Sequence, residues 1–148
     1  MVLRMNCFLT ISSIIIYIEN RVEEKIDFRE LERVTGFSIT YIREIFVQKT
    51  NTSLSRYILI RKISNAAYEI LYSKQSIMEI AFKYNFSSYD TFTRAFKRIT
   101  GLTPSVFRTK RPPVGRIKLC SSAFGIGILN EGKSSQSLLG RENEQHEK

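Results

Sequence analysis

Hydrophobic positions recur with a helical period along most of the chain. The clearest run consists of Ile11, Ile14, Ile15 and Ile18. Their spacing of i, i+3, i+4 and i+7 puts four apolar side chains on one face of a helix. From Thr10 to Arg108 we find no convincing alternation of period two, which is the pattern of strands. The pattern therefore predicts an all-α fold built from short helices.

The first apolar run superficially resembles a secretory signal, but polar residues interrupt it. Thr10, Ser12 and Ser13 lie inside the stretch from Phe8 to Ile18, and no convincing small-residue cleavage site follows. The stretch is also shorter than the roughly 20 apolar residues that span a bilayer. We therefore expect a helix packed on a protein core, and no membrane partner.

Three pairs of residues indicate where helices begin. They are Asp27 with Glu30, Ser76 with Glu79, and Thr103 with Pro104. The first two pairs have the capping-box spacing, in which an N-cap oxygen and an acidic side chain each accept from a free backbone amide. In the third pair a cap residue precedes a proline, whose missing N–H costs nothing at the first helical position. Each pair predicts the first turn of a helix.

The chain contains an internal repeat. Sliding the sequence over itself by 49 positions, and by 50 after one inserted residue, superposes similar residues. The matched pairs are Phe28 with Ile77, Glu30 with Glu79, Leu31 with Ile80, Gly36 with Asn85, Phe37 with Phe86, Ile42 with Phe92, Phe46 with Phe96, Thr50 with Thr100, and Ser53 with Thr103. The repeat predicts two copies of one helix-turn-helix unit, at residues 27–50 and 76–100.

The turn and the spacing of the copies bear on what the repeat does. Gly36 and Asn85 occupy the same place in the turn, and both residue types tolerate the left-handed backbone of a sharp helix-to-helix turn. Two ordinary helical hairpins would show the same turn. Residues 54–73, however, are predicted to form a connecting helix about 30 Å long. This is close to the roughly 34 Å between successive major-groove faces of B-DNA, which favours two DNA-reading units.

The second helix of each copy has a polar stripe opposite its apolar positions. The residues that we expect to read bases are Thr40, Arg43 and Glu44 in the first copy and Tyr89, Asp90, Thr93 and Arg94 in the second. Arginine pairs with guanine, acidic groups accept from cytosine N4, and Thr or Tyr contacts a thymine methyl group or a phosphate. Solvation alone would also make such a stripe polar, so the interpretation depends on the equivalent placement of both stripes.

Charge is distributed unequally between the copies. The formal net charge is +9, which suits a polyanionic partner without specifying one. Residues 76–111 contain seven basic residues against Glu79 and Asp90, whereas the first copy and the helix before it are nearly balanced. We therefore expect phosphate attraction to be concentrated in the second half, with Lys97 as a phosphate contact.

The residue inventory does not favour an enzyme. His146 is the sole histidine, no nucleophile has a partnered base, and no Gly-rich phosphate loop or metal-ligand spacing occurs in the sequence. Cys7 and Cys120 have no neighbouring Cys or His, which favours a reducing cytoplasm over a disulfide. We expect a cytoplasmic protein without catalytic residues, cofactor or metal.

The composition divides the chain into three segments. An N-terminal extension is predicted at residues 1–9 and the DNA-binding domain at 10–111. Pro112 and Pro113 would stop any helix, and the residues after them are rich in Gly, Ser, Gln and Glu, so residues 112–148 are predicted to be a disordered tail. The alternative is a tail that docks on the domain through Phe124 and Ile126.

Several segments together carry a family resemblance. They are Ile18-Glu19-Asn20, Gly36-Phe37-Ser38, Tyr57-Ile58 with Arg61-Lys62, Ile80-Ala81 with Tyr84, Phe86-Ser87-Ser88, the run from Thr91 to Lys97, and Thr103-Pro104 with Phe107-Arg108. With these segments, residues 10 to about 111 resemble the DNA-binding module of the AraC/XylS family of bacterial transcription regulators. The likeness is greatest to its small MarA/SoxS/Rob group.

The resemblance implies a module of about seven helices in two lobes, which binds double-stranded DNA as a monomer and activates transcription with RNA polymerase. Each lobe would offer one helix to one of two adjacent major-groove segments, and Arg61 of the connecting helix would lie near phosphate. This sequence has Thr40 and Glu44 where the group has a tryptophan and an arginine, and Tyr89 and Asp90 where it has paired glutamines. The DNA sequence read by that group is therefore not transferred.

A second hypothesis belongs to a different class of function. An interaction protein could keep this fold and antagonise another regulator or the polymerase without reading DNA. Glu44, Asp90 and an expected exposed stretch at Leu59 and Ile60 make this conceivable. A salt-dependent DNA-binding assay separates the two hypotheses.

Overall fold

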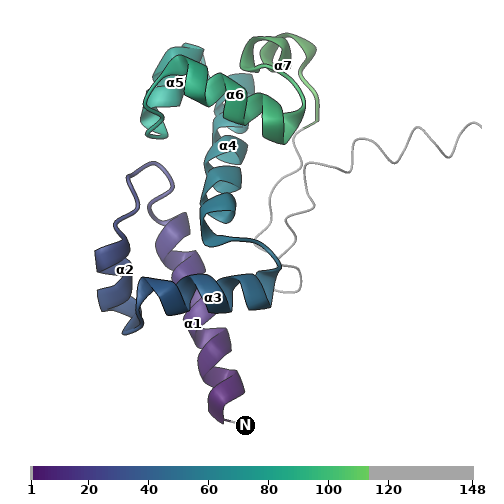
Figure 1. Ribbon diagram of the computed structural model, residues 1–148. Coiled ribbons are helices and arrows are strands. Elements are labelled where there is room, and N and C mark those ends of the chain that lie inside the picture. Colours follow the sequence, from purple (N-terminus) through teal and green to yellow (C-terminus); the bar gives the residue numbers. More distant parts are fainter. Residues whose placement is uncertain (1, 114–148) are drawn as a thin grey trace, which may run out of the picture. The chain divides into compact units, whose positions relative to one another are not determined.

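The computed structural model describes the backbone of residues 2–113 and the side chains of residues 9–113. These residues form helices α1 (Val2–Glu19), α2 (Phe28–Thr35), α3 (Ile39–Thr50), α4 (Leu54–Tyr72), α5 (Ile77–Lys83), α6 (Tyr89–Thr100) and α7 (Pro104–Lys110), shown in Figure 1. Within this part of the chain there are seven helices and no strand, which confirms the predicted all-α fold.

The first helix is longer than its isoleucine pattern indicates. Residues 2–9, predicted to be an extension before the domain, are helical and continue α1 in the N-terminal direction. The physical reason is that this segment contains no glycine or proline, and Leu, Arg and Met within it favour the helix. The predicted tail lies outside the described residues from position 114 on.

The first lobe consists of α1, α2, α3 and the beginning of α4. Ile11, Ile14 and Ile18 of α1 are almost completely buried, as their spacing predicts, and Ile15 lies half-buried at the edge of the core. The other fully buried side chains of this lobe are Leu31, Ile42, Phe46 and Leu54. Burying an apolar side chain of this size contributes about 1.5–3 kcal/mol, so these residues hold α1, α2 and α3 together.

The second lobe consists of the end of α4 with α5, α6 and α7, and its core is aromatic. The rings of Phe92 and Phe96 have centroids 5.5 Å apart, and Phe96 meets Phe107 of α7 edge to face at 5.1 Å. Edge-to-face pairs of this kind add about 0.5–1.5 kcal/mol to the burial of their surface. These contacts fix α7 against the second helix of the second copy.

The predicted helix starts are present, with one correction. Ser76 and Glu79 form a complete capping box, and Thr103 caps α7 ahead of Pro104. Asp27 caps α2, but the Glu30 side chain does not return to the cap. Its carboxylate instead accepts from Tyr17, at 2.8 Å, and Arg21, at 3.2 Å. Because burial and this hydrogen bond disfavour the phenolate, the pKa of Tyr17 is raised to about 12.

The two copies agree in their helix caps, hydrogen bonds and turns as well as in the order of their helices. Ser38 and Ser88, fifty positions apart, cap α3 and α6 in the same way. The Thr50 hydroxyl donates to the Phe46 carbonyl at 2.7 Å, and the Thr100 hydroxyl donates to the Phe96 carbonyl at 2.9 Å. The helix-turn-helix turns also agree, because Gly36 has φ 72° and Asn85 has φ 61°, the left-handed region that both were predicted to adopt.

Candidate nucleic-acid interface

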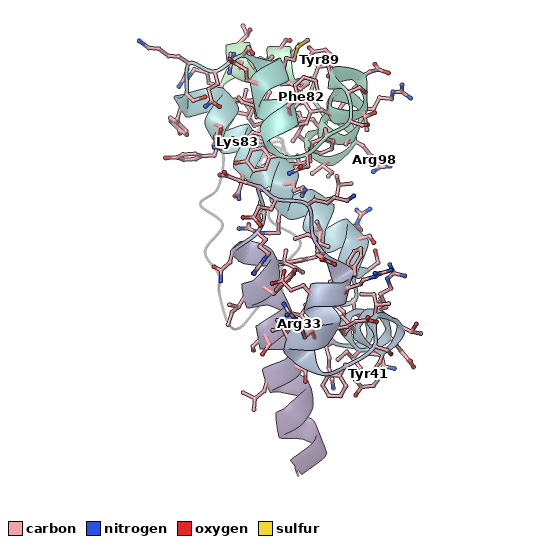
Figure 2. All side chains as sticks on the ribbon, turned by 90° about the vertical axis from the view of Figure 1, so that its left-hand side faces the viewer. Arg33, Tyr41, Phe82, Lys83, Tyr89 and Arg98 are labelled. Carbon is pink, nitrogen blue, oxygen red and sulfur yellow. The ribbon has the colours of Figure 1, made fainter. Side chains whose placement is uncertain are left out.

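The second helices of the two copies, α3 and α6, lie across opposite ends of α4 (Figure 1). α4 has 19 residues and is therefore about 28 Å long at 1.5 Å per residue. In Figure 2, Tyr89 at the start of α6 lies near the top of the molecule and Tyr41 of α3 lies in its lower part. The separation of the two helices is thus of the order of one turn of B-DNA, about 34 Å.

Matched positions of α3 and α6 carry different chemistry. Fifty residues separate Thr40 from Asp90, Arg43 from Thr93, and Glu44 from Arg94. The acidic Asp90 therefore stands in the second copy where the first has the neutral Thr40, and the basic Arg94 stands where the first has the acidic Glu44. The two surfaces are equivalent in position but differ in chemistry.

On α3 the predicted residues Thr40, Arg43 and Glu44 are all exposed. The guanidinium carbon of Arg43 lies 5.4 Å from the centroid of the Phe28 ring, close enough for a cation–π contact. The Glu44 carboxylate accepts from Gln48 at 3.5 Å, one turn further along the helix. α3 thus presents a cation and an anion side by side.

The structure contains an aromatic pair that the polar stripes did not predict. The rings of Tyr41 and Phe37 lie 4.9 Å apart at the beginning of α3, and both side chains are exposed. The sequence identified Phe37 only as the match of Phe86 in the repeat and as part of a segment that carries the family resemblance. The signal that could have revealed the pair is the spacing of four residues across the cap at Ser38. An exposed ring here can stack on a sugar or contact a thymine methyl group.

On α6 the predicted residues Tyr89, Asp90 and Arg94 are exposed. Asp90 and Arg94 form an ion pair across one helical turn, and Arg94 donates to one carboxylate oxygen through both Nε and Nη2. The hydrogen bond to Asp90 raises the pKa of Arg94, so the guanidinium stays charged. This pair is the most charged feature of the α6 stripe.

Thr93 departs from the prediction that it faces outward. The residue is half-buried, and its hydroxyl oxygen is buried with no hydrogen-bond partner among the described residues. At about 100° per residue, Thr93 falls at the border between the core stripe and the exposed stripe. Its methyl group is therefore better placed for contact than its hydroxyl.

Arg61 was predicted to lie near phosphate, and the structure contradicts this. Its side chain is 11% exposed and donates to both carboxylate oxygens of Glu19, each at 2.6 Å. Tyr57 donates to the same carboxylate at 3.0 Å, and burial followed by the Glu19 charge raises the Tyr57 pKa. Because Arg61 is directed into the joint between α1 and α4, its charge serves the fold.

The structure also modifies two further expectations about the surface. Leu59 and Ile60 are half-buried, so the exposed apolar stretch predicted on the connecting helix is absent from this described part of α4. Several basic residues of the second half are engaged internally, because Arg108 donates to the Ile70 carbonyl at 2.9 Å and Arg111 to the Leu71 carbonyl at 3.0 Å. Such contacts satisfy free carbonyls at the end of α4.

Three cations of the second half remain turned to solvent. Lys97, Arg98 and Lys110 are exposed, and among residues 9–113 none of them forms an ion pair. Lys97 and Arg98 lie in the last turns of α6, beyond the Asp90 and Arg94 pair. The second lobe therefore keeps a basic surface next to its stripe.

Comparison with known proteins identifies a family that shares this geometry. A family model described as a helix-turn-helix domain matches residues 31–110. Over 101 residues the chain is 33% identical to the transposon Tn10 TetD protein of Escherichia coli. The aligned segment covers 68% of this chain and 73% of that protein. It is also 38% identical over 101 residues to the F1 operon positive regulatory protein of Yersinia pestis. That alignment covers 68% of this chain but only 34% of the longer Yersinia protein.

A solved structure has the same fold. The crystal structure of a transcriptional regulator with an AraC-type DNA-binding domain from Chromobacterium violaceum superposes with a TM-score of 0.65 at 23% identity, covering 72% of this chain and 95% of that one. Two helix-turn-helix units on one chain define a DNA-binding regulator. The chain belongs to the AraC-type helix-turn-helix family of transcription regulators.

Two kinds of feature are absent from the described residues. Among them, no helix combines the length and apolar character needed to cross a membrane. The same residues contain no cluster of three or more His, Cys, Asp or Glu side chains that could hold a metal ion.

Proposed function

We propose that this protein binds one double-stranded DNA site through α3 and α6, in two adjacent major-groove segments, and activates transcription together with RNA polymerase in the bacterial cytoplasm. The observation that carries the proposal is the paired placement of α3 and α6, with the same caps and with exposed, chemically different stripes. Positive regulation is a property stated for the Yersinia pestis relative, and it is extended here to this chain. No catalytic step is proposed.

Within each stripe we assign roles by chemistry. Arg43 and Arg94 would read guanine, and Glu44 and Asp90 would accept from cytosine N4. Thr40, Tyr89 and the Thr93 methyl group would contact thymine or the backbone, and Lys97 would neutralise a phosphate. Arg61 is not assigned to DNA because Glu19 holds it inside the protein.

The experiment is selection of bound duplexes from a random DNA pool, followed by affinity measurements over a range of salt and transcription from a template carrying the selected site. We expect one enriched sequence, an affinity for it at least about a thousandfold above that for random DNA, and more transcript when the protein is added to RNA polymerase. A protein that stays folded but enriches no sequence would favour the antagonist instead. The half-burial of Leu59 and Ile60 already removes one of the surfaces on which that alternative depended.

A further inference from the structure

The two lobes are connected by more than the continuous helix α4. The loop between α1 and α2 belongs to the first lobe, and it contacts the turn between α5 and α6 of the second. Lys62 of α4 lies between them, and its ammonium group donates to the Glu24 carbonyl and to the Tyr84 carbonyl, each at 3.1 Å. The Asn85 side-chain amide donates to the Glu23 carbonyl at 2.5 Å. We call these five residues the interlobe bridge.

Each end of the interlobe bridge is itself held in place. The Tyr84 side chain is buried and donates to Glu69 of α4 at 2.6 Å. Lys83, next to it, pairs with Glu69 at 2.7 Å and with Glu23 of the first lobe at 3.3 Å. Asn85 is fixed by its left-handed backbone, with φ 61°. The first-lobe loop follows Glu19, which Arg61 binds at 2.6 Å.

All three acceptors at the interlobe bridge are backbone carbonyls. A carbonyl cannot rotate away from its donor as a side chain can, so the three hydrogen bonds from these two donor groups fix the distance between the backbones themselves. Lys62 is half-buried, and an ammonium group in that setting depends on its partners because its hydration shell is incomplete. The bridge therefore resists twisting and bending of one lobe against the other.

From this we propose that Lys62 and Asn85 are positioning residues that set the spacing between the two DNA segments read by the protein. The inference rests on the proposed binding through α3 and α6. Inserting one base pair between the two half-sites moves the second by about 3.4 Å and turns it by about 35°. Lobes locked at one angle cannot follow that rotation, whereas lobes joined by α4 alone have more freedom to adapt.

The test uses the full chain, its selected DNA site, and versions of that site with one or two base pairs inserted between the half-sites. The variant is Lys62→Met combined with Asn85→Gly. Methionine keeps the length of the lysine stem without its donors, and glycine keeps the left-handed backbone without the amide. The matched control is Lys74→Met, which removes the same charge from an exposed position outside the bridge.

We expect the unmodified protein and the control to lose roughly tenfold or more in affinity on the one-base-pair insertion, the cost of a misplaced base contact. The variant should lose about threefold or less, and its slope of log affinity against log salt should be unchanged on the original site. Circular dichroism and thermal melting establish that each variant is folded. If the double variant unfolds, Lys62→Met alone is measured in the same way.

Two results would overturn the inference. One is a folded variant that discriminates against the inserted base pair as strongly as the unmodified protein does. The other is an equal loss of affinity on every spacing with a flatter salt slope, which would make Lys62 a phosphate contact. Failure of the unmodified protein to bind any selected duplex would refute the proposed function instead, so the two failures are distinguishable.

Discussion

At the scale of single residues, the exposed ion pair on α6 bears most directly on the proposed specificity for DNA. Asp90 accepts from Nε and Nη2 of Arg94, which orients the guanidinium along the helix and leaves the N–H groups of Nη1 free. Both side chains are well exposed, at 70% and 78%, so the pair is screened by salt and contributes little to stability. Its consequence is orientation: an arginine held in place loses less side-chain freedom when it reaches a base.

Asp90→Asn should therefore loosen specificity without unfolding the protein. The substitution releases Arg94 and removes one negative charge, so affinity for random duplexes should rise while the ratio of selected to random affinity falls by about fivefold or more. Glu24→Gln is the matched control, because it removes the same charge from an exposed side chain that lies on neither stripe. Equal ratios for the two variants would show that the ion pair has no part in discrimination.

Arg43 and Lys97 should differ in the kind of binding that they support. Arg43→Ala should relax the preference at one base pair, by about 1–3 kcal/mol of discrimination, with little change in salt dependence. Lys97→Ala should weaken binding to selected and random duplexes alike and reduce the salt slope by about one. Both variants are measured on matched duplexes and on duplexes with single base changes, over a range of salt. A shifted base preference in Lys97→Ala with an intact slope would contradict this division.

The sequence could identify most of the candidate surface residues because helical period alone decides which face a residue occupies. Thr40, Arg43, Glu44, Asp90 and Arg94 are exposed as the stripes predict. Arg61 fails because its burial depends on Glu19, which lies 42 residues away in the sequence. Periodicity assigns a residue to a face of its own helix, but it does not predict which other helix will cover that face.

At the scale of elements, Gly36 tests how the first helix-turn-helix turn is specified. Its φ of 72° lies in the left-handed region, and a Cβ added there would meet no atom within 4 Å. The cost of alanine is therefore one of backbone conformation alone, and Gly36→Ala should lower the free energy of unfolding by about 1 kcal/mol. Gly36→Asn should cost less, because asparagine already occupies this place in the second copy as Asn85. Chemical denaturation measures both variants, and equal costs would contradict the argument.

The joint between α1 and α4 makes a second prediction about elements. Glu19 and Arg61 are 14% and 11% exposed, so removing one partner leaves a charge with little access to water. Arg61→Leu should lower the free energy of unfolding by about 3–5 kcal/mol, as should Glu19→Leu. The double variant should cost clearly less than the sum, because no charge is then left unpaired. Additive costs in urea denaturation would show that the pair is not coupled.

Local signals predicted the elements better than the contacts between them. The caps at Ser76 and Thr103 and the turn at Asn85 depend on residues adjacent in sequence, and each is present. The full length of α1 escaped prediction because helix continuation there depends on propensity, without a hydrophobic stripe. The interlobe bridge escaped as well: Lys62 lies 38 residues from Glu24, and Asn85 lies 62 residues from Glu23.

At the scale of the whole described domain, one chain carries both of the surfaces proposed to read DNA. The stripes differ at each of the three matched positions, Thr40 with Asp90, Arg43 with Thr93, and Glu44 with Arg94. A dimer of identical chains requires a palindrome, whereas two different stripes on one chain require none. We therefore expect one chain to bind one asymmetric site of about two helical turns, roughly 20 base pairs. Sedimentation of the complex should give one protein per duplex, and footprinting should give one continuous protected segment without two-fold symmetry. A palindromic footprint occupied by two chains would contradict this prediction, because it would show that two identical chains recognise the site symmetrically.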